Sequence, residues 1–184
     1  MTTLHRGAPE KSLVPWVPTA AVAVALASFF VATYSACQTW TAQRLAVAPR
    51  IHLDFRYRAG DRASIHVLNV GVGPAEVEAL TVRLDGREQS SWRQLLTSIG
   101  AGTTRDLIYG RYPRGTFYKA GYEGVLIEVT GPEAAAAFSK AFNRLEIAAC
   151  YCSLYDDCWR VELPKYTTTK APDGCPAPAR EMDE

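Results

Sequence analysis

Four cysteines lie close together in the last quarter of the chain, and they carry the most distinctive chemistry in the sequence. Cys150, Cys152, Cys158 and Cys175 have the spacing C-x-C-x5-C-x16-C. Such a set can form two disulfides, hold a zinc ion as four thiolates, or remain reduced. The spacing lacks the paired C-x2-C turns that are typical of structural zinc sites. We therefore expect disulfides, with a metal site and reduced structural thiols as the alternatives.

The residues around the cysteines predict which of them pair. The surrounding segment reads as two strands joined by a turn at residues 155–157. A hairpin folded about this turn places Cys152 opposite Cys158, near the separation that a disulfide needs. Cys150 and Cys175 are then the second pair, which would attach the Pro-rich tail to the sheet. Disulfides indicate an oxidising compartment.

Two histidines, His52 and His66, are the candidates for acid–base or metal chemistry beyond the N-terminal tail. Both fall on the polar side of neighbouring strand patterns, and Asp54 should lie beside His66 across a hairpin. These three residues could hold a metal ion, but exposed polar pairs between strands are far commoner. The sequence has no G-x-S-x-G motif, and a Ser-His-Asp relay has few candidate members. We therefore expect no catalytic residue, no metal or other cofactor, and no enzyme.

A segment that mixes basic and aromatic residues is the candidate interaction surface. Arginine and aromatic side chains are enriched where proteins contact partners, and basic residues also favour lipid head groups. The alternative is a set of aromatic strands with solvated charges. The expected surface consists of Arg105, Tyr109, Arg111, Tyr112, Arg114, Phe117, Tyr118 and Lys119.

The overall charge argues against a nucleic-acid partner. The chain has 20 basic and 19 acidic residues, and a formal net charge of +1. Without Arg6, Glu10 and Lys11, which precede the apolar segment, 18 basic and 18 acidic residues remain. This balance creates no strong positive field, so we expect no nucleic-acid binding.

The loop Asn69-Val-Gly-Val-Gly-Pro-Ala75 is the most distinctive turn in the sequence. Two glycines after a strand can belong to a dinucleotide-binding loop, but Glu76 stands at the third glycine position and Pro74 interrupts the pattern. We expect a structural loop instead. Its asparagine can bond the turn backbone, and Gly71 and Gly73 permit positive φ angles.

Alternating residues predict the strands that position these groups. Residues 51–58 alternate strictly between apolar and polar side chains, which is the period of a half-buried strand. A turn at 59–61 leads to a second strand at 64–70, and a third runs from 76 to 84. Further strands are expected near 105–109 and 124–129, before the cysteine hairpin.

Two short helices complete the predicted domain. Ser90 or Ser91 can cap one helix through Leu96, and residues 132–143 form the other, with a proline near its first position. About seven strands with two short helices predict a mainly β domain, as an immunoglobulin-like β-sandwich.

Two local motifs resemble segments of a group of bacterial proteins. The glycine loop at 69–75, followed by Asp85-Gly86, Trp92 and Leu95, resembles small β-sandwich domains of uncharacterised single-pass membrane proteins. The hairpin Tyr151-Cys-Ser…Cys158-Trp159 resembles a second segment of such proteins. More loosely, the Asn-x-Gly-x-Gly-x-Ala pattern is similar to adhesion-type immunoglobulin-like modules. The resemblance covers residues 50–165 discontinuously, and it implies a fold and a topology but no activity.

A long apolar segment precedes the β domain. Residues 12–43 contain no charged side chain, and about 20 helical residues are enough to cross the hydrocarbon core of a bilayer. Trp16, Tyr34 and Trp40 lie near its ends, where amphipathic aromatic residues favour the interfaces. We expect a retained membrane anchor. The alternatives are a cleaved signal peptide, a lipoprotein signal ending at Cys37, or a buried helix of a soluble fold.

The predicted organisation follows from these segments. It comprises a cytoplasmic tail at 1–12, a transmembrane helix at 13–40, a juxtamembrane helix or linker at 41–49, a β-sandwich at 50–166 and an irregular tail at 167–184. The charges that flank the apolar segment do not decide its orientation, so the disulfides place the domain outside the cytoplasm.

The sequence therefore predicts a single-pass protein of the inner membrane with a periplasmic structural or interaction module. Such a module could be an accessory subunit of a larger membrane complex, with the lipid bilayer and other membrane or periplasmic proteins as partners. The alternative is an ectodomain that senses a ligand or a carbohydrate.

Overall fold

The computed structural model describes residues 16–102, 107–110 and 112–177, and the chain divides into two compact units, Met1–Gln43 and Arg44–Glu184. The first unit contains most of helix α1 (Trp16–Ala46), which has 31 residues. Within it, Thr19–Ala46 is long and apolar enough to cross a membrane by length and composition. Alanine-rich sequence favours the helix, and Pro49 stands shortly after its end.

Four hydroxyl groups of α1 are bonded within the helix. The side chains of Ser28, Thr33, Thr39 and Thr41 each donate to the carbonyl oxygen four residues earlier, at 2.8–3.0 Å. Large apolar side chains such as Phe29 and Phe30 are 65% and 68% exposed. Between Ala20 and Ala32 the exposed surface of this helix is apolar apart from Ser28, which is costly in water.

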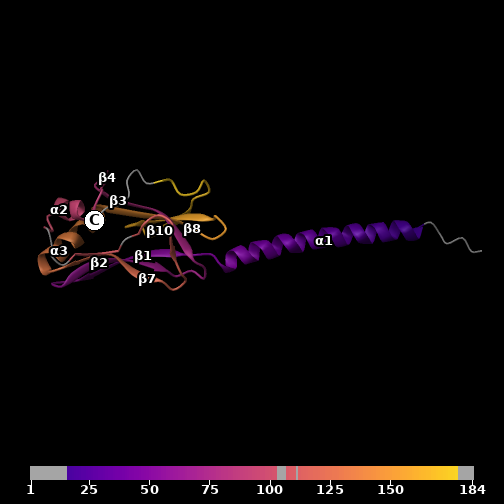
Figure 1. Cartoon of the computed structure of the whole chain (residues 1–184), viewed down its shortest axis with the longest axis horizontal. Coiled ribbons are helices and arrows are strands. Elements are labelled where there is room, and N and C mark those ends of the chain that lie inside the picture. The colour runs from indigo at the N-terminus through magenta and orange to yellow at the C-terminus, as the bar shows by residue number, and fades with distance from the viewer. Residues whose placement is uncertain (1–15, 103–106, 111, 178–184) are drawn as a thin grey trace, which may run out of the picture. The chain divides into compact units, whose positions relative to one another are not determined.

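The second unit is mainly β and consists of two antiparallel sheets (Figure 1). The four-stranded sheet has the order β1 (Ile51–Arg58), β2 (Arg62–Asn69), β7 (Glu123–Thr130) and β5 (Leu107–Tyr109). The six-stranded sheet has the order β10 (Thr167–Lys170), β9 (Cys158–Leu163), β8 (Leu145–Cys152), β3 (Ala75–Leu84) and β4 (Arg87–Glu88), with β6 (Thr116–Tyr118) also paired to β3. The predicted mainly β architecture is confirmed.

The hairpin of β1 and β2 follows the predicted alternation at the start of β1, whereas Tyr57, on the side predicted to be buried, is 45% exposed. Ile51 and Leu53 are 1% exposed, whereas His52 between them is exposed. The register pairs Asp54 with His66, as expected from the sequence. Alternation fixes which residues share a face, because successive side chains of a strand point to opposite sides.

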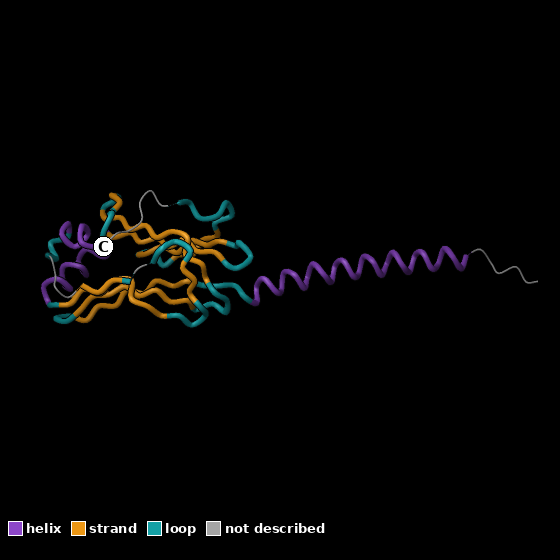
Figure 2. Tube along the Cα trace, in the orientation of Figure 1, coloured by secondary structure: helices purple, strands orange, loops and turns teal. Residues whose placement is uncertain are grey.

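The hydrophobic core includes residues from both sheets and from the two short helices. Trp92, Leu95 and Leu96 of α2 (Trp92–Ser98) and Phe138 of α3 (Pro132–Ala141) are at most 2% exposed. The short 3-10 helix η1 (Phe142–Arg144) follows α3, and the ring of Phe142 stacks on Phe55 at 4.0 Å. The helices α2 and α3 lie at one end of the domain, which we call the distal end (Figure 2).

The expectation of an irregular tail is wrong for its first four residues, Thr167–Lys170, whereas residues 171–177 form no helix or strand. Residues 167–170 form β10, which pairs with β9 in the register Thr167↔Glu162 to Lys170↔Trp159. All four residues of β10 are exposed, so no buried alternation marks this strand in the sequence. Its three consecutive threonines suit an edge strand, because β-branched residues favour extended backbone.

Replacing Ser91 by alanine is expected to destabilise the domain by about 1 kcal/mol, since Ser91 caps the start of α2. Its side-chain oxygen accepts the amide N–H of Gln94 at 3.2 Å, and its backbone is extended. Chemical denaturation of the full chain in detergent would measure the change. Ser98→Ala, at the exposed end of the same helix, is the control and should change stability by less than about 0.5 kcal/mol. Equal effects of the two substitutions would contradict the capping role.

Candidate functional site

The four clustered cysteines form two disulfides, in the pairs expected from the hairpin. Cys152 is bonded to Cys158 across β8 and β9, where the two residues face each other in the register. Cys150 is bonded to Cys175, and this bond attaches the chain beyond β10 to the sheet. Both bonds lie within the second unit, so they brace the β domain internally.

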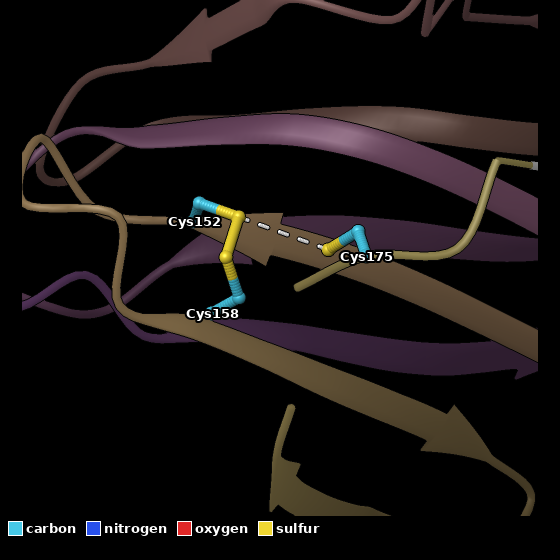
Figure 3. Close-up of side chains that lie close together, drawn as sticks. All are labelled: Cys152, Cys158 and Cys175. Carbon is cyan, nitrogen blue, oxygen red and sulfur yellow. Dashed lines mark hydrogen bonds between the residues drawn. A yellow bond between two sulfur atoms is a disulfide. The ribbon is translucent and has the colours of Figure 1, made fainter. Parts of the chain in front are cut away.

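The sulfur atoms of the two disulfides lie against each other. The Sγ atoms of Cys152 and Cys175 are 3.8 Å apart although they are not bonded (Figure 3). With Cys158 they form a group whose sulfur atoms lie within 4.8 Å of one another. A metal ion binds cysteine as the thiolate, and each of these sulfurs is instead part of a disulfide. In this oxidation state the group braces the hairpin.

The glycine loop after β2 is held by the side chain of Asn69, which is 1% exposed. Its Oδ1 accepts the amide N–H groups of Arg50 and Gly71, both at 3.1 Å. Its Nδ2 donates to the carbonyl oxygens of Gly73 at 2.8 Å and Tyr118 at 2.9 Å. One side chain therefore joins three segments of backbone, and the structural role expected for this loop rests on these bonds.

Gly71 and Gly73 are needed in this loop because they lack a side chain, and not for the φ angles that the sequence led us to expect. Neither has a positive φ angle, so the prediction of left-handed backbone is wrong. Instead, a Cβ atom on Gly73 would lie 1.7 Å from the carbonyl oxygen of Val47, and one on Gly71 would lie 2.3 Å from the amide nitrogen of Arg50. Only glycine allows the loop backbone to approach residues 47–50 so closely.

The turn between β8 and β9 contacts the same part of the chain. The guanidinium group of Arg44 lies 2.8 Å from the carboxylate of Asp157 and donates to the carbonyl oxygen of Tyr155 at 3.2 Å. Ser153 stabilises the turn from within, because its Oγ accepts the amide N–H groups of Tyr155 and Asp157. Residues 44–50 are thus bonded to two separate loops at one end of the domain, which we call the proximal end.

The loops of the proximal end expose large apolar side chains. Val70 is 58% exposed, Val72 is 68% exposed, and Leu154 of the β8–β9 turn is 60% exposed. We call these three residues the apolar rim. Sequence reasoning missed them, although valines that alternate with glycines in a loop are a usable signal, since loop tips are usually polar. Lys119 and Arg50 are exposed at the same end.

The predicted interaction surface is divided by the fold. Arg105 and Arg111 lie outside the described residues. Of the other six, three are exposed and three pack inward. The exposed residues are Arg114, Phe117 and Lys119, and the inward residues are Tyr109, Tyr112 and Tyr118. The prediction of a surface residue is wrong for Tyr118, which is 4% exposed, whereas Tyr109 and Tyr112 are half-buried.

An aromatic cluster explains why the tyrosines turn inward. The rings of Tyr112 and Tyr118 lie 5.6 Å apart, and those of Tyr118 and Tyr122 lie 4.5 Å apart. The hydroxyl group of Tyr112 donates to the carbonyl oxygen of Val125 at 2.7 Å. Burial raises the pKa of Tyr112 and of Tyr118, because the phenolate would lose its hydration. Of the exposed residues, Arg114 pairs with Glu78 at 2.7 Å.

A polar cluster covers the outer face of β1, β2 and β7 around His66. The imidazole lies 3.1 Å from the hydroxyl of Ser64 and 3.6 Å from the carboxylate of Glu123. Arg56 lies among these groups and pairs with Asp54 and with Glu123, each at 2.8 Å. Both carboxylates that could complete a metal site are thus bonded to a guanidinium group, and the cluster is organised as an ion-pair network.

The same cluster has the order of groups found in a serine-based catalytic relay. Such a relay needs a serine that can reach its substrate. Ser64 is only 2% exposed, and its neighbours on β1 and β7 flank it. The hydrogen bond between Ser64 and His66 therefore serves to orient the imidazole in this conformation.

The stability of the β domain is expected to fall when the pH drops below about 6.5, because His66 resists protonation in the fold. Burial, followed by the nearby charge of Arg56, lowers the pKa of His66 below 6.5. The unfolded chain then binds a proton more readily than the folded one, so stability is present above the unfolded pKa and is lost as the pH falls through the folded pKa.

Denaturation across this pH range would measure the effect in the wild type and in His66→Gln. We expect the variant to lose the part of the pH dependence that lies near neutrality. His52→Gln, which removes an exposed imidazole from the neighbouring strand, should retain it. An unchanged pH profile for His66→Gln would contradict the assignment.

Comparisons with protein-family models, with curated proteins and with solved structures find no match for this chain. The resemblance of its loop and hairpin motifs to bacterial single-pass membrane proteins therefore stays a prediction.

Proposed function

We propose that this protein is a single-pass membrane protein whose β domain is an extracytoplasmic interaction module. One observation carries the proposal: an apolar segment of 28 residues within α1, Thr19–Ala46, leads within five residues into a domain braced by two disulfides. The helix has the length and composition of a bilayer anchor. The disulfides fit an oxidising compartment, which in a bacterium is the periplasm on the outer side of the inner membrane.

In this proposal the β domain is an immunoglobulin-like sandwich that binds other membrane or periplasmic proteins, as an accessory subunit of a larger complex. The two antiparallel sheets are consistent with a sandwich. Phe117 is the centre of the binding surface, because it is 54% exposed and lies in the sequence between two exposed basic residues, Arg114 and Lys119. Exposed aromatic residues next to basic ones are typical of contact surfaces.

The inward packing of the tyrosine cluster favours an interaction module over a ligand-sensing domain. An aromatic ligand site needs rings that line an open cavity. Tyr112 and Tyr118 instead contact each other and Tyr122, and Tyr118 is 4% exposed. These tyrosines therefore serve the core.

Labelling of thiols in intact cells tests the topology. Spheroplasts of cells that produce a Cys37→Ser chain are treated with a membrane-impermeant maleimide, with and without prior reduction by an impermeant phosphine. We expect the four remaining cysteines to react from outside, and only after reduction, because they are paired. Reaction only after lysis, without any reductant, would place the domain in the cytoplasm and overturn the proposal.

Native electrophoresis after mild detergent extraction tests the interaction. The wild-type chain should migrate in a complex larger than its own oligomer, and Phe117→Asp should release it. Tyr57→Asp is the matched control, because Tyr57 is an exposed aromatic residue near the distal end of β1. If the two variants behave alike, or if the wild type migrates alone, Phe117 is not the centre of a binding surface.

A further inference from the structure

The two loops of the apolar rim are held in place rather than loosely extended. Val70 and Val72 flank Gly71, whose amide N–H is bonded to Asn69, and the amide of Val70 donates to the carbonyl oxygen of Arg50 at 2.9 Å. Leu154 belongs to the turn that Ser153 and Arg44 stabilise. Because exposed apolar side chains are unfavourable in water, several of them on loops at one end of a domain mark a candidate for contact with a partner surface.

The glycine loop of the rim is bonded to residues that directly follow α1, and this limits which surface the rim can contact. The amide N–H groups of Val72 and Gly73 lie 3.2 Å and 3.4 Å from the carbonyl oxygen of Ala48. Ala48 is two residues beyond Ala46, where α1 ends, and two residues span at most about 7 Å. The loop is thus tied to the first residues after the apolar helix, however that helix is oriented.

The second loop is tied even closer to the apolar segment. Arg44 is the first charged residue after the charge-free stretch at 12–43, and it bonds the turn that carries Leu154. In a membrane-spanning chain, a basic residue at this place lies at the level of the lipid head groups. Both loops of the rim are therefore attached to residues 44–50, next to the boundary of the bilayer.

The charges beside the rim suit an anionic lipid surface. Arg50 and Lys119 are exposed, and their backbone carbonyl groups bond Val70 and Asn69, so both residues lie next to the glycine loop. On the other loop, Asp157 is paired with Arg44 and Lys170. Asp156 is exposed two residues after Leu154, and anionic head groups repel its negative charge. We therefore expect the glycine loop to approach the lipid surface more closely than the β8–β9 turn does.

From these observations we infer that the apolar rim is a lipid-binding surface: Val70 and Val72 insert into the head-group region of the membrane in which α1 is anchored, with Leu154 at a shallower depth. This inference rests on the proposed function, because it needs α1 in the bilayer. The domain would then be held against the membrane by three contacts, the helix and two loops, instead of rotating freely on its helix.

Site-specific fluorescence in vesicles tests the inference on the full chain. A Cys37→Ser chain receives one new cysteine, Val72→Cys, which is labelled without reductant with a dye sensitive to polarity. The labelled protein is reconstituted into vesicles of phosphatidylcholine and phosphatidylglycerol. We expect a blue shift of the emission, quenching by lipids that carry a spin label high on the acyl chain, and protection from iodide in the water.

Two control positions separate this inference from the proposed function. Ala59→Cys lies in the exposed turn after β1, whose eight residues extend about 26 Å away from the proximal end. Its dye should remain fully accessible to iodide. Leu26→Cys lies within α1 and should be quenched by spin labels deep in the bilayer. If position 26 is not quenched, the membrane anchor itself is wrong.

If position 26 is quenched but the dye at position 72 is as accessible to iodide as that at position 59, the anchor stands and the lipid-binding rim is overturned. In that case the rim would be a surface for another protein, because the vesicles contain no partner. A third label, at Leu154→Cys, should be less protected than that at position 72. Equal or stronger protection there would contradict the deeper insertion of the glycine loop.

Discussion

Replacing Asn69 by alanine is expected to lower the free energy of unfolding of the β domain by about 3–5 kcal/mol, because two buried and two partly buried backbone groups lose the hydrogen bonds that its side chain makes. Two N–H groups lose the Oδ1 acceptor, and the carbonyl oxygens of Gly73 and Tyr118 lose the Nδ2 donor. A buried polar group that loses its hydrogen bond costs about 1–3 kcal/mol, and partial relaxation reduces the total.

Chemical denaturation of the full chain in detergent, followed by tryptophan fluorescence, would measure this change. Trp92 and Trp159 lie within the β domain and report on its packing. Asn143→Ala, at an exposed position after α3, is the control and should have an effect within about 0.5 kcal/mol. A loss of less than about 1 kcal/mol at Asn69 would show that the loop is held by other contacts.

Asn69→Asp separates the shape of the side chain from its hydrogen bonds. The aspartate keeps an oxygen for Arg50 and Gly71, but its second oxygen would face the carbonyl oxygens of Gly73 and Tyr118. Because oxygen cannot donate there unless it is protonated, we expect this nearly isosteric change to destabilise the domain as well. A neutral effect would mean that the amide is not oriented as described.

Removing the disulfide between Cys150 and Cys175 should cost more stability than removing the one between Cys152 and Cys158. The first bond closes a sequence separation of 25 residues and the second a separation of 6. Loop-closure entropy predicts losses of about 3.5 kcal/mol and about 2 kcal/mol for the two bonds, because the longer loop gains more freedom in the unfolded chain. The variants are the two double substitutions to alanine, and thermal unfolding of the full chain would compare them.

The same comparison tests the role of the longer-range bond in forming β10. In Cys150→Ala/Cys175→Ala, the backbone amides of Thr167–Lys170 should exchange their hydrogens faster, because this exposed edge strand loses its covalent attachment. Cys37→Ala removes the remaining cysteine, which is exposed on α1, and should leave both properties unchanged. A larger loss from the shorter-range bond would contradict the entropic account.

The structure also shows how far local patterns reach. For the glycine loop, the sequence predicted a structural role but not the reason why glycine is required there. Positive φ angles are a property of the loop alone, whereas the need for glycine at Gly73 comes from Val47, 26 positions earlier in the chain. Asn69 likewise bonds Tyr118, 49 positions away. Partners at such separations leave no periodic signal in the sequence.

The basic and aromatic segment shows that local composition does not identify an exposed surface either. Its composition suits an exposed contact region as well as a half-buried set of strands. The pairing of β6 with β3 decides between these two possibilities for Phe117 and Tyr118. In this pairing Tyr118 faces the core and Phe117 faces outward. Alternation along three residues separates the two faces but does not tell which of them is buried.

The sequence by itself determined the features that depend on neighbouring residues: the long apolar helix, the β1–β2 hairpin with Asp54 opposite His66, and the pairing of the cysteines. Their signals are continuous hydrophobicity, a period of two, and symmetry about a turn. The tertiary structure alone decided the inward packing of the tyrosines, the edge strand β10 and the apolar rim beside residues 44–50. These depend on which distant segments meet, because burial and close backbone approach are set by the packing of whole sheets and loops.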